Sequence, residues 1–463
     1  MKTNTLDFDA QALRERILDL AMRGKLVPQD PNDEPASELV KNNDLKSSDE
    51  KPHDIPDSWE WIVLGSGVKF INGRAYKKSE LLEDSSLTPV LRVGNLFTNS
   101  SWYYSNLNLD PNKYIDNRDL IYAWSASFGP KIWDGGHVIY HYHIWKLILD
   151  QAINKNYLYY FLLDKRNVIG ETDLHGSTMK HITKTNMEHL SFPLPPFLEQ
   201  KRIAAKIAQL FTLLHKIEAS TQQYAELQTL LKSKVLDLAM RGKLVKQDPN
   251  DEPASVLLEE IKTEKAELVK EKKSKKSKPL PPITDEEKPF DIPDSWEWVR
   301  LGAIFDITSS KRVMKSEWRN EGVPFYRARE IVSIKNHRAL KDPIFISEET
   351  YKEKAEVSGR PKIDDILLTG VGTLGVPYVV SDNKEFYFKD GNIIWLRNIG
   401  KINSYYISNY IQSPYMTKII NNGRGTTVAT LTIVRARNLL VPLPPLMEQT
   451  RIVNKINKLY KLI

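Results

Sequence analysis

Three histidines are the residues whose type and spacing come closest to a reactive site. His137, His141 and His143 occur within GGHVIYHYHIW, and the last two share one face of a predicted strand. Histidine side chains in such a cluster could ligate a metal, but no carboxylate stands at ligand spacing from them. The pattern therefore favours a structural or polar-surface role, with metal binding as the alternative.

A glycine-rich segment, Gly370-x-Gly372-x-x-Gly375, has the spacing of a dinucleotide-binding fingerprint. The strand-like run DDILL precedes it, as that fingerprint requires. The run VPYVV follows, which predicts another strand instead of the helix whose N-terminus holds a pyrophosphate. We therefore predict a glycine turn here, and nucleotide binding is the less favoured alternative.

Motifs for other kinds of catalysis are missing from the sequence. It contains no P-loop, no serine nucleophile elbow and no HExxH helix. Cysteine is absent, which excludes disulfides, a thiolate metal site and a cysteine nucleophile. We predict no catalytic residues, no metal site and no cofactor on this chain, and interpret it as a recognition protein.

Polar and basic side chains in turn-like stretches are the groups that DNA recognition would use. Arg and Lys read guanine edges, Asn reads adenine, and hydroxyl groups contact phosphate oxygens. The 66 Lys and Arg exceed the 59 Asp and Glu, and this net charge of +7 favours a polyanionic partner. The candidates are Arg74, Lys77, Lys78, Arg92, Asn95, Ser125, Ser127, Lys131, Ser177, Thr178, Lys180, His181, Ser310, Lys311, Arg312, Arg327, Arg329, Thr369, Thr373, Arg424, Thr426 and Thr427. Because loops are polar in any protein, we expect roughly half of them to contact nothing.

The elements that must position these loops are written twice in the chain. Residues 17–37 recur at 235–255 with 19 of 21 positions identical, and DIPDSWEW occurs at 54–61 and at 291–298. A third block, PLPPFLEQKRIAAKI at 193–207, returns as PLPPLMEQTRIVNKI at 442–456. The segments between the second and third blocks are far less alike. This asymmetry predicts two modules with one architecture and two separate specificities.

The second copy holds 19 extra residues, which fall in a basic stretch. Residues 262–278 contain eight Lys and three Glu. The composition predicts a solvated linker that is helical at its start. A basic arm that binds DNA is the alternative.

A long helix is predicted from Leu198 to Arg241, because this stretch contains no Pro or Gly. Apolar residues recur at heptad spacing along it, and its 44 residues would span about 66 Å. The N-terminus copies the second half of this helix, and the C-terminus copies the first half. The residues predicted to pair the helices are Leu13, Ile17, Leu20, Ile203, Ile207, Leu210, Leu214, Ile217, Leu231, Val235, Leu238, Ile452, Ile456 and Leu459.

These offsets predict a cyclic, pseudo-twofold α+β protein. Two similar globular domains would be separated by a pair of long antiparallel coiled-coil helices, one continuous and one broken at the chain termini. The alternative is amphipathic helices that pack on unrelated surfaces. The predicted segments are an N-terminal helix and linker (1–53), a first globular domain (54–196), a central helix and basic linker (197–290), a second globular domain (291–445) and a C-terminal helix (446–463).

Length and composition agree with this organisation. The 463 residues predict about three domains, and 41% hydrophobic with 27% charged residues is typical of globular proteins. Neither a signal-peptide pattern nor an apolar run of membrane-spanning length is found, so we expect a cytoplasmic protein without a membrane partner.

The repeated blocks resemble those of the specificity subunit of type I restriction-modification enzymes. The similarity rests on LDLAMRGKLVPQDPNDEPAS, DIPDSWEW, RDLIYAWSASFG, DDILLTGVGTLG, HGSTMKHIT, GRGTTVATLT and PLPPxxEQxRI, and covers essentially the whole chain. The resemblance implies two target recognition domains, each binding one half of a split double-stranded DNA sequence. Helical spacers would set the gap between the halves.

The resemblance also implies partners. Two methyltransferase subunits would dock on the helices, and motor-nuclease restriction subunits would join them. S-adenosylmethionine, ATP and Mg²⁺ would then belong to those partners, and this chain would perform no catalysis. Two further hypotheses stay open: a self-contained DNA methyltransferase or nuclease, and a scaffold whose helices bind only proteins.

Overall fold

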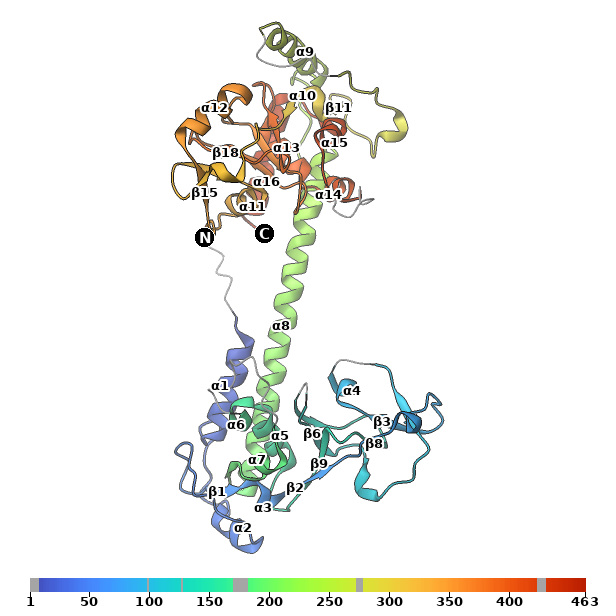
Figure 1. Cartoon of the computed structure of the whole chain (residues 1–463), viewed down its shortest axis with the longest axis vertical. Coiled ribbons are helices and arrows are strands. Elements are labelled where there is room, and N and C mark those ends of the chain that lie inside the picture. Colours follow the sequence, from blue (N-terminus) through green and yellow to red (C-terminus); the bar gives the residue numbers. More distant parts are fainter. Residues whose placement is uncertain (1–7, 98–99, 126–127, 170–181, 272–277, 423–429) are drawn as a thin grey trace. The chain divides into compact units, whose positions relative to one another are not determined.

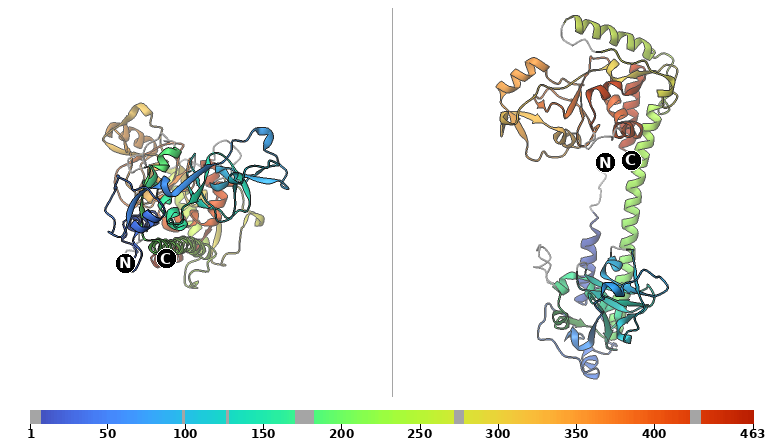
Figure 2. Two further views of the ribbon diagram at one scale, coloured as in Figure 1. Left: turned by 90° about the horizontal axis from the view of Figure 1, so that it is seen from below. Right: turned by 45° about the vertical axis from the view of Figure 1, so that its right-hand side comes forward.

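The structure is a computed structural model that describes residues 8–97, 100–125, 128–169, 182–271, 278–422 and 430–463 (Figure 1). The chain divides into unit 1 (Met1–Gln222) and unit 2 (Gln223–Ile463), and each is described by itself. Helix α8 (Phe197–Met240) is continuous in Figure 1 and in the right view of Figure 2, and contributes its first part to unit 1 and its remainder to unit 2.

Unit 1 begins with a helix and continues through short strands to the first part of α8. Its elements before α8 are α1 (Ala10–Met22), α2 (Ala36–Asn42), β1 (Glu60–Val63), α3 (Leu64–Gly67), β2 (Val68–Asn72), β3 (Thr88–Leu91), α4 (Val93–Phe97), β4 (Tyr103–Ser105), β5 (Tyr114–Ile115), β6 (Leu120–Ala123), β7 (Gly129–Ile132), β8 (Val138–Tyr140), β9 (Ile144–Leu149), α5 (Lys155–Leu163), α6 (Lys165–Ile169), α7 (Lys184–Glu188) and β10 (Ser191–Leu194).

Unit 2 begins with the remainder of α8 and follows a similar order, with β13 and α12 as additional elements and no counterpart of β5. Its later elements are α9 (Ala254–Lys270), β11 (Glu297–Arg300), α10 (Leu301–Ile304), β12 (Asp306–Thr308), β13 (Trp318–Arg319), β14 (Val323–Tyr326), α11 (Ala328–Lys335), β15 (Ile344–Ile346), α12 (Glu348–Ser358), β16 (Ile366–Thr369), β17 (Pro377–Val379), β18 (Tyr387–Phe388), β19 (Ile393–Arg397), α13 (Ser404–Ile411), α14 (Pro414–Asn421), α15 (Ile433–Asn438), β20 (Leu440–Leu443) and α16 (Leu446–Tyr460).

Corresponding sheets are found in the described parts of both units. One antiparallel sheet has the order β2-β9-β6-β7 in unit 1 and β12-β19-β16-β17 in unit 2. A second sheet contains a parallel pair, β3 with β8 in unit 1 and β14 with β18 in unit 2. A third pairs the strand after DIPDSW with the strand before α8 or α16. The predicted α+β class is therefore confirmed, and the duplication extends to the strand order of the first and third sheets, while the second sheets differ in their edge strands.

An antiparallel helix pair lies in each unit, as predicted. In unit 1, Arg14 near the start of α1 donates to Glu218, while Leu18 lies in the core with Ile203 and Ile207. In unit 2, α16 begins near the end of α8 and runs back along it. There, Ile456 lies in the same core as the α8 residues Leu236 and Met240, and the Tyr460 hydroxyl donates to Lys232 O at 3.3 Å. Unit 1 thus takes its first helix from the N-terminus, and unit 2 takes its last helix from the C-terminus.

The side chains buried between the helices differ in part from the predicted set. Leu18 and Leu236, each one position after a predicted pairing residue, are buried in the cores. Leu13 is 43% exposed, and Ile217 and Leu231 are exposed as well. A single pair of helices buries one narrow stripe of each, so apolar residues at the edge of that stripe remain in solvent.

A buried glutamate joins the repeated blocks of unit 1. Glu199, which is 1% exposed, accepts hydrogen bonds from Trp59 Nε1 at 3.0 Å and from Gln29 Nε2 at 2.6 Å. Burial raises the pKa of this carboxyl, and the hydrogen bonds from Trp59 and Gln29 oppose that rise. The start of α8 is thereby attached to the segments that follow α1.

Unit 2 repeats this arrangement with its own residues. Glu448 accepts from Trp296 Nε1 at 2.9 Å and from Gln247 Nε2 at 2.6 Å, and burial raises its pKa as well. The identical sequence blocks therefore encode a common framework. The segments that differ between the modules are free to form different surfaces on it.

Three sequence predictions about local structure have distinct outcomes. The glycine turn is confirmed: it joins β16 to β17, and Gly372 and Gly375 have φ of 77° and 72°. The linker helix is present as α9, but Lys265 on it is half-buried instead of fully solvated. The prediction of one strand through His141 and His143 is wrong, because the chain turns at these residues and passes from the sheet of β8 to the sheet of β9.

Lys265 tolerates its partial burial because its ammonium group donates to backbone carbonyls. Its Nζ donates to the carbonyl oxygens of Gly302, Ala303 and Phe305 at 2.8–3.0 Å. Burial lowers its pKa to about 8. The helix α9 is therefore held against α10.

Candidate nucleic-acid interface

The loops of unit 1 that carry predicted DNA contacts converge on the turn between β8 and β9, residues 141–143. Tyr142 N donates to Arg74 O at 3.1 Å, in the loop after β2. His141 N donates to Leu91 O at 2.9 Å, immediately before Arg92. Trp124 N, at the end of β6, donates to the His143 carbonyl at 3.0 Å. Three loops that are distant in sequence therefore meet at one turn, which we call turn A.

Basic side chains surround turn A. The Arg74 guanidinium donates to Glu80 Oε1 at 2.8 Å and lies 5.5 Å from the Tyr76 ring centroid. The Arg92 guanidinium lies 4.3 Å from the Tyr103 ring centroid. Arg74 Nη1 and Arg92 Nε are buried without a hydrogen-bond partner in the described part of the chain. A buried donor without a partner is costly unless water or a ligand accepts from it.

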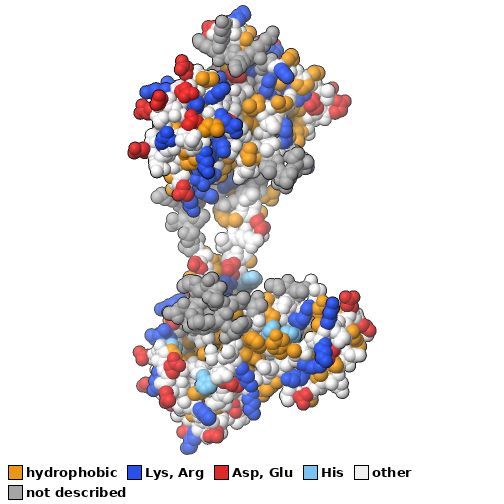
Figure 3. Space-filling model, viewed as in Figure 1, with side chains coloured by type: hydrophobic (Ala, Val, Ile, Leu, Met, Phe, Trp, Pro, Cys, Tyr) orange, Lys and Arg blue, Asp and Glu red, His pale blue; other side chains and the backbone are white. Residues whose placement is uncertain are grey.

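Aromatic rings and imidazoles form the surface of turn A. The ring of Tyr142 lies 3.9 Å from that of His143 and 4.4 Å from that of His141, centroid to centroid. The Trp124 ring lies 4.9 Å from His143, and Tyr76 stacks on His141 at 6.5 Å. Figure 3 shows histidine and hydrophobic side chains side by side over the strands labelled β6 and β9 in Figure 1.

The histidine at the centre of this cluster is held neutral. Burial, together with the charges of His143 and Arg92, lowers the pKa of His141 to about 4. His137 lies in a different environment, where it contacts Asp116 at 2.6 Å and stacks on Tyr114. Among the described residues, no group of His, Asp and Glu is arranged to hold a metal ion.

The remaining candidates of unit 1 have varied surroundings. Lys77 and Lys78 are exposed, and Ser125 is half-buried. Asn95 is committed to its own loop, since it accepts from Arg92 N and donates to Ser101 O. Lys131 lies 5.7 Å from the Trp133 ring centroid. The candidates outside the described residues are Ser127, Ser177, Thr178, Lys180, His181, Arg424, Thr426 and Thr427.

Unit 2 brings its loops together at the corresponding turn between β18 and β19, residues 389–392, which we call turn B. Lys389 N donates to Tyr326 O at 2.8 Å, immediately before Arg327. Gly370 N, after β16, donates to Asn392 O at 2.8 Å. The loop after β12 joins this turn as well, through Ser310 Oγ on Phe388 O at 2.6 Å.

Charged side chains dominate the surroundings of turn B. Arg312 lies 3.7 Å from Asp390, and Lys311 is exposed beside it. Arg327 and Arg329 both contact Glu330; burial would raise the pKa of this carboxyl, but the two arginines lower it. Figure 3 shows Lys and Arg side chains gathered over α11, which follows Arg327.

Thr369 is placed differently from the prediction. Its side chain is fully buried, donates to Thr373 O and accepts from Val376 N at 2.9 Å. It closes the glycine turn and is not available to DNA, because β16 points it inward. Thr373 itself is exposed.

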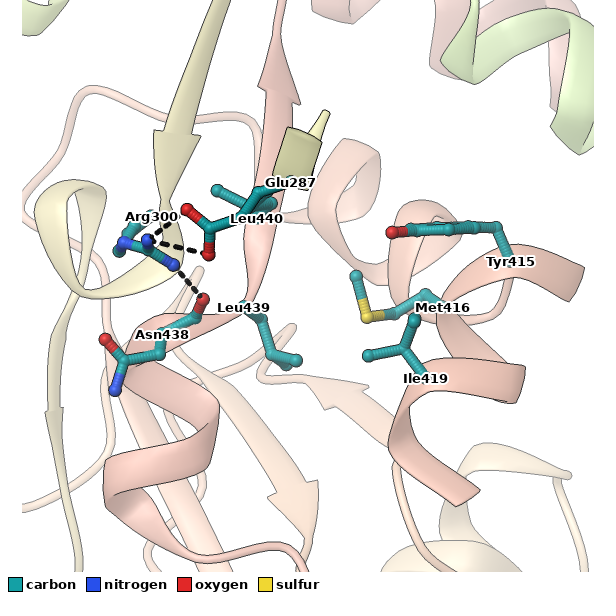
Figure 4. Close-up of a pocket in the computed structure, with 8 residues that line it drawn as sticks. All are labelled: Glu287, Arg300, Tyr415, Met416, Ile419, Asn438, Leu439 and Leu440. Atoms are coloured by element: carbon teal, nitrogen blue, oxygen red, sulfur yellow. Dashed lines mark hydrogen bonds and ion pairs between the residues drawn. The ribbon is translucent and has the colours of Figure 1, made fainter. Parts of the chain in front are cut away.

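A small pocket in unit 2 has a structural role. It is lined by Glu287, Arg300, Tyr415 and Met416, among others (Figure 4). The buried Arg300 donates to Glu287 at 2.9 Å and to Asn438 O at 3.0 Å. These contacts attach the residues before β11 to the domain, and the pocket presents no reactive group.

Sequence reasoning did not select Tyr76, Trp124, His141, Tyr142 or His143 for DNA contact. The signal that could have identified them is the polar and aromatic run HYH inserted between two apolar segments, HVIY and IWKLIL. Such a run predicts a strand break and a surface turn, but its neighbours in space are far away in sequence.

A family model described as "Type I restriction modification DNA specificity domain" matches residues 56–228 and 293–463. The chain belongs to this family. The specificity subunit is 31% identical to the EcoAI specificity subunit of Escherichia coli, over 98% of this chain and 89% of that protein. It is 29% identical to the EcoEI specificity subunit of the same organism, with the same coverage.

The fold of the specificity subunit is also found among solved structures. A chain from "Structural basis underlying complex assembly and conformational transition of the type I R-M system" matches with a TM-score of 0.57 and 18% identity. The match covers 89% of this chain and 92% of that chain. No helix in the described part of this subunit combines the length and hydropathy needed to cross a membrane.

Proposed function

We propose that this specificity subunit recognises an asymmetric, bipartite sequence in double-stranded DNA, one half-site per unit. The observation that supports this proposal is the convergence of three polar loops on turn A in unit 1 and on turn B in unit 2. The strands that carry the two turns correspond between the units, whereas the turns and the loops around them differ in chemistry. Equivalent surfaces with different residues suit two unlike half-sites.

We further propose that the helices set the gap between the half-sites. In support, α8 is one continuous helix, and it contributes to the helix pairs of both units. A continuous helix has a fixed rise per residue, so its length is suited to act as a spacer.

In this proposal the subunit performs no catalysis and directs methyltransferase and restriction subunits to the DNA. The similar solved chain comes from work on complex assembly of a type I system, which supports the same kind of assembly here. Exposed apolar residues of α8, among them Leu213, Leu227 and Leu230, are suited to contact such partners. S-adenosylmethionine, ATP and Mg²⁺ would be bound by the partners.

The experiment is to delete one heptad, residues 219–225, from α8. Seven residues correspond to about 10.5 Å of helix and hence to about three base pairs at 3.4 Å each. The subunit, assembled with its methyltransferase subunits, is used to select DNA from a random library that is then sequenced. We expect the gap to shorten by about three base pairs while both half-sites persist.

A matched control replaces the same seven residues with helix-forming residues at unchanged length, and its gap should equal that of the wild type. An unchanged gap in the deletion variant would contradict the spacer. Methyl transfer or cleavage by the purified subunit alone, given Mg²⁺ and S-adenosylmethionine, would contradict the non-catalytic role. Absence of salt-dependent DNA binding by the assembled complex would favour a protein-binding scaffold instead.

A further inference from the structure

Turns A and B occupy the same position in two copies of one framework. Turn A follows β8, which pairs in parallel with β3, and turn B follows β18, which pairs in parallel with β14. Each turn then enters the inner strand of the four-stranded antiparallel sheet, β9 or β19. The sequences are HYH in turn A and KDGN in turn B. The residues at this shared position are therefore a place where the two units differ in chemistry.

The backbone of turn A is held rigidly by the loops around it. Tyr142 N donates to Arg74 O, and Trp124 Nε1 donates to Tyr142 O at 2.9 Å. Imidazole and indole rings surround the phenol ring of Tyr142. The Tyr142 side chain is nevertheless 37% exposed. A ring that is supported from behind and open in front is preorganised for contact with a ligand.

The side chains around Tyr142 differ in the part of DNA that they are suited to contact. Arg74 and Arg92, from the adjoining loops, are suited to phosphate oxygens. Turn A itself contains no lysine or arginine, and burial lowers the pKa of its His141 so that this imidazole is neutral at physiological pH. The Tyr142 hydroxyl can hydrogen-bond a phosphate oxygen, whereas the face of its ring is apolar and suits an apolar group. Among the groups that base pairs present in the major groove, the thymine 5-methyl group is the apolar one.

We propose that turn A is a base-reading element of unit 1, and that the Tyr142 ring contacts the 5-methyl group of a thymine in the half-site of that unit. This inference rests on the proposed DNA-recognition function. Turn B, with Lys389 and Asp390 at the same position, reads its half-site with charged groups instead. The difference between the turns contributes to the asymmetry of the target.

The test uses the subunit assembled with its methyltransferase subunits and the bipartite sequence selected by the wild-type complex. Each thymine of both half-sites is replaced in turn by uracil, which lacks only the methyl group. For the wild type, we expect one replacement to weaken binding about fourfold, the value of one buried methyl group. The variant Tyr142→Ala should bind the thymine and uracil versions of that site equally well.

Two further variants separate the ring from other effects. Tyr142→Phe keeps the ring, so it should keep the fourfold discrimination. Tyr405→Ala removes an exposed tyrosine of α13 in unit 2, 46% exposed, and should also discriminate as the wild type does. The dependence of binding on salt should be the same for all of them, because no phosphate contact is removed. Thermal unfolding of each variant verifies that unit 1 is folded.

The inference is overturned if the wild type does not distinguish thymine from uracil at any position, or if Tyr142→Ala distinguishes them as the wild type does. It is also overturned if no half-site contains thymine. These results leave the proposed function intact as long as the wild type selects a bipartite sequence. Failure to select any sequence would instead refute the proposed function, and the inference with it.

Discussion

The buried glutamates of the framework permit a stability experiment with an internal control. In unit 1, Glu199 accepts one hydrogen bond from Trp59 and one from Gln29. The substitution Trp59→Phe keeps an aromatic ring and removes the indole N–H. The substitution Trp296→Phe makes the same change in unit 2, where Glu448 loses its corresponding donor.

The expected magnitude follows from the burial of the carboxyl. Glu199 is 1% exposed, so water cannot replace the lost donor. Loss of a hydrogen bond to such a group costs about 1–3 kcal/mol of unfolding free energy. Unit 1 spans Met1–Gln222, and in a domain of this size each kcal/mol shifts the Tm by roughly 2–4 °C. The lost hydrogen bond should therefore lower the Tm of unit 1 by roughly 2–12 °C, and the smaller Phe ring adds a cavity cost because Trp59 is buried.

The pH dependence of this effect has a definite sign. Burial raises the pKa of Glu199 above its ordinary value of 4.5, whereas the Trp59 hydrogen bond lowers it. Removing that bond raises the folded-state pKa further. A raised carboxyl pKa contributes stability that is fully present below 4.5 and is lost as pH rises through the folded-state pKa. The folded-state pKa of Glu199 is higher in the variant, so the variant loses more stability than the wild type as pH rises. The destabilisation caused by Trp59→Phe should therefore grow from acidic to neutral pH.

Differential scanning calorimetry of the subunit from acidic to neutral pH measures both the decrease in Tm and its dependence on pH. We expect Trp59→Phe to lower only the unfolding transition of unit 1, and Trp296→Phe to lower only that of unit 2. A destabilisation of less than about 0.5 kcal/mol, or one that does not change with pH, would refute the reasoning.

Three further predictions concern the helix pair, the basic loops and α9. Arg14→Ala should lower the unfolding free energy by less than about 1 kcal/mol, because the ion pair of Arg14 with Glu218 is partly exposed. Leu18→Ala in the core should lower it by about 2–5 kcal/mol. Equal effects of the two variants in urea denaturation would contradict this difference. Lys78→Ala should reduce the slope of the logarithm of the DNA-binding constant against the logarithm of salt by about one, measured by fluorescence anisotropy, and an unchanged slope would exclude a phosphate contact. Burial lowers the pKa of Lys265 to about 8 from 10.5, so the unfolded state binds more protons in this range. As pH increases from about 8 to 10.5, the unfolding free energy of the wild type should therefore rise relative to that of Lys265→Met. Parallel pH profiles of the two proteins in chemical denaturation would disprove this linkage.

Local patterns in the sequence were sufficient for the framework. The stretch from Leu198 to Arg241, without Pro or Gly, predicted a helix that the structure places at Phe197–Met240. The run VPYVV after Gly375 predicted a strand, and β17 lies within it. Helical periodicity and turn chemistry depend on neighbours within a few residues, so one sequence contains the information. The repeated blocks further predicted that the helices at the two ends of the chain each pair with the central helix, as α1 and α16 do with α8.

The recognition surface depended on contacts that no local pattern records. The sequence contained the basic and polar loops, but the pairing of β3 with β8 brings Leu91 and Arg92 to His141. The same tertiary contacts partly bury Lys265 and turn Thr369 inward. The sequence by itself therefore determined that this is a duplicated framework with polar loops. Only the tertiary structure decided which turn those loops surround, because strand pairing between distant segments depends on the packing of the whole domain.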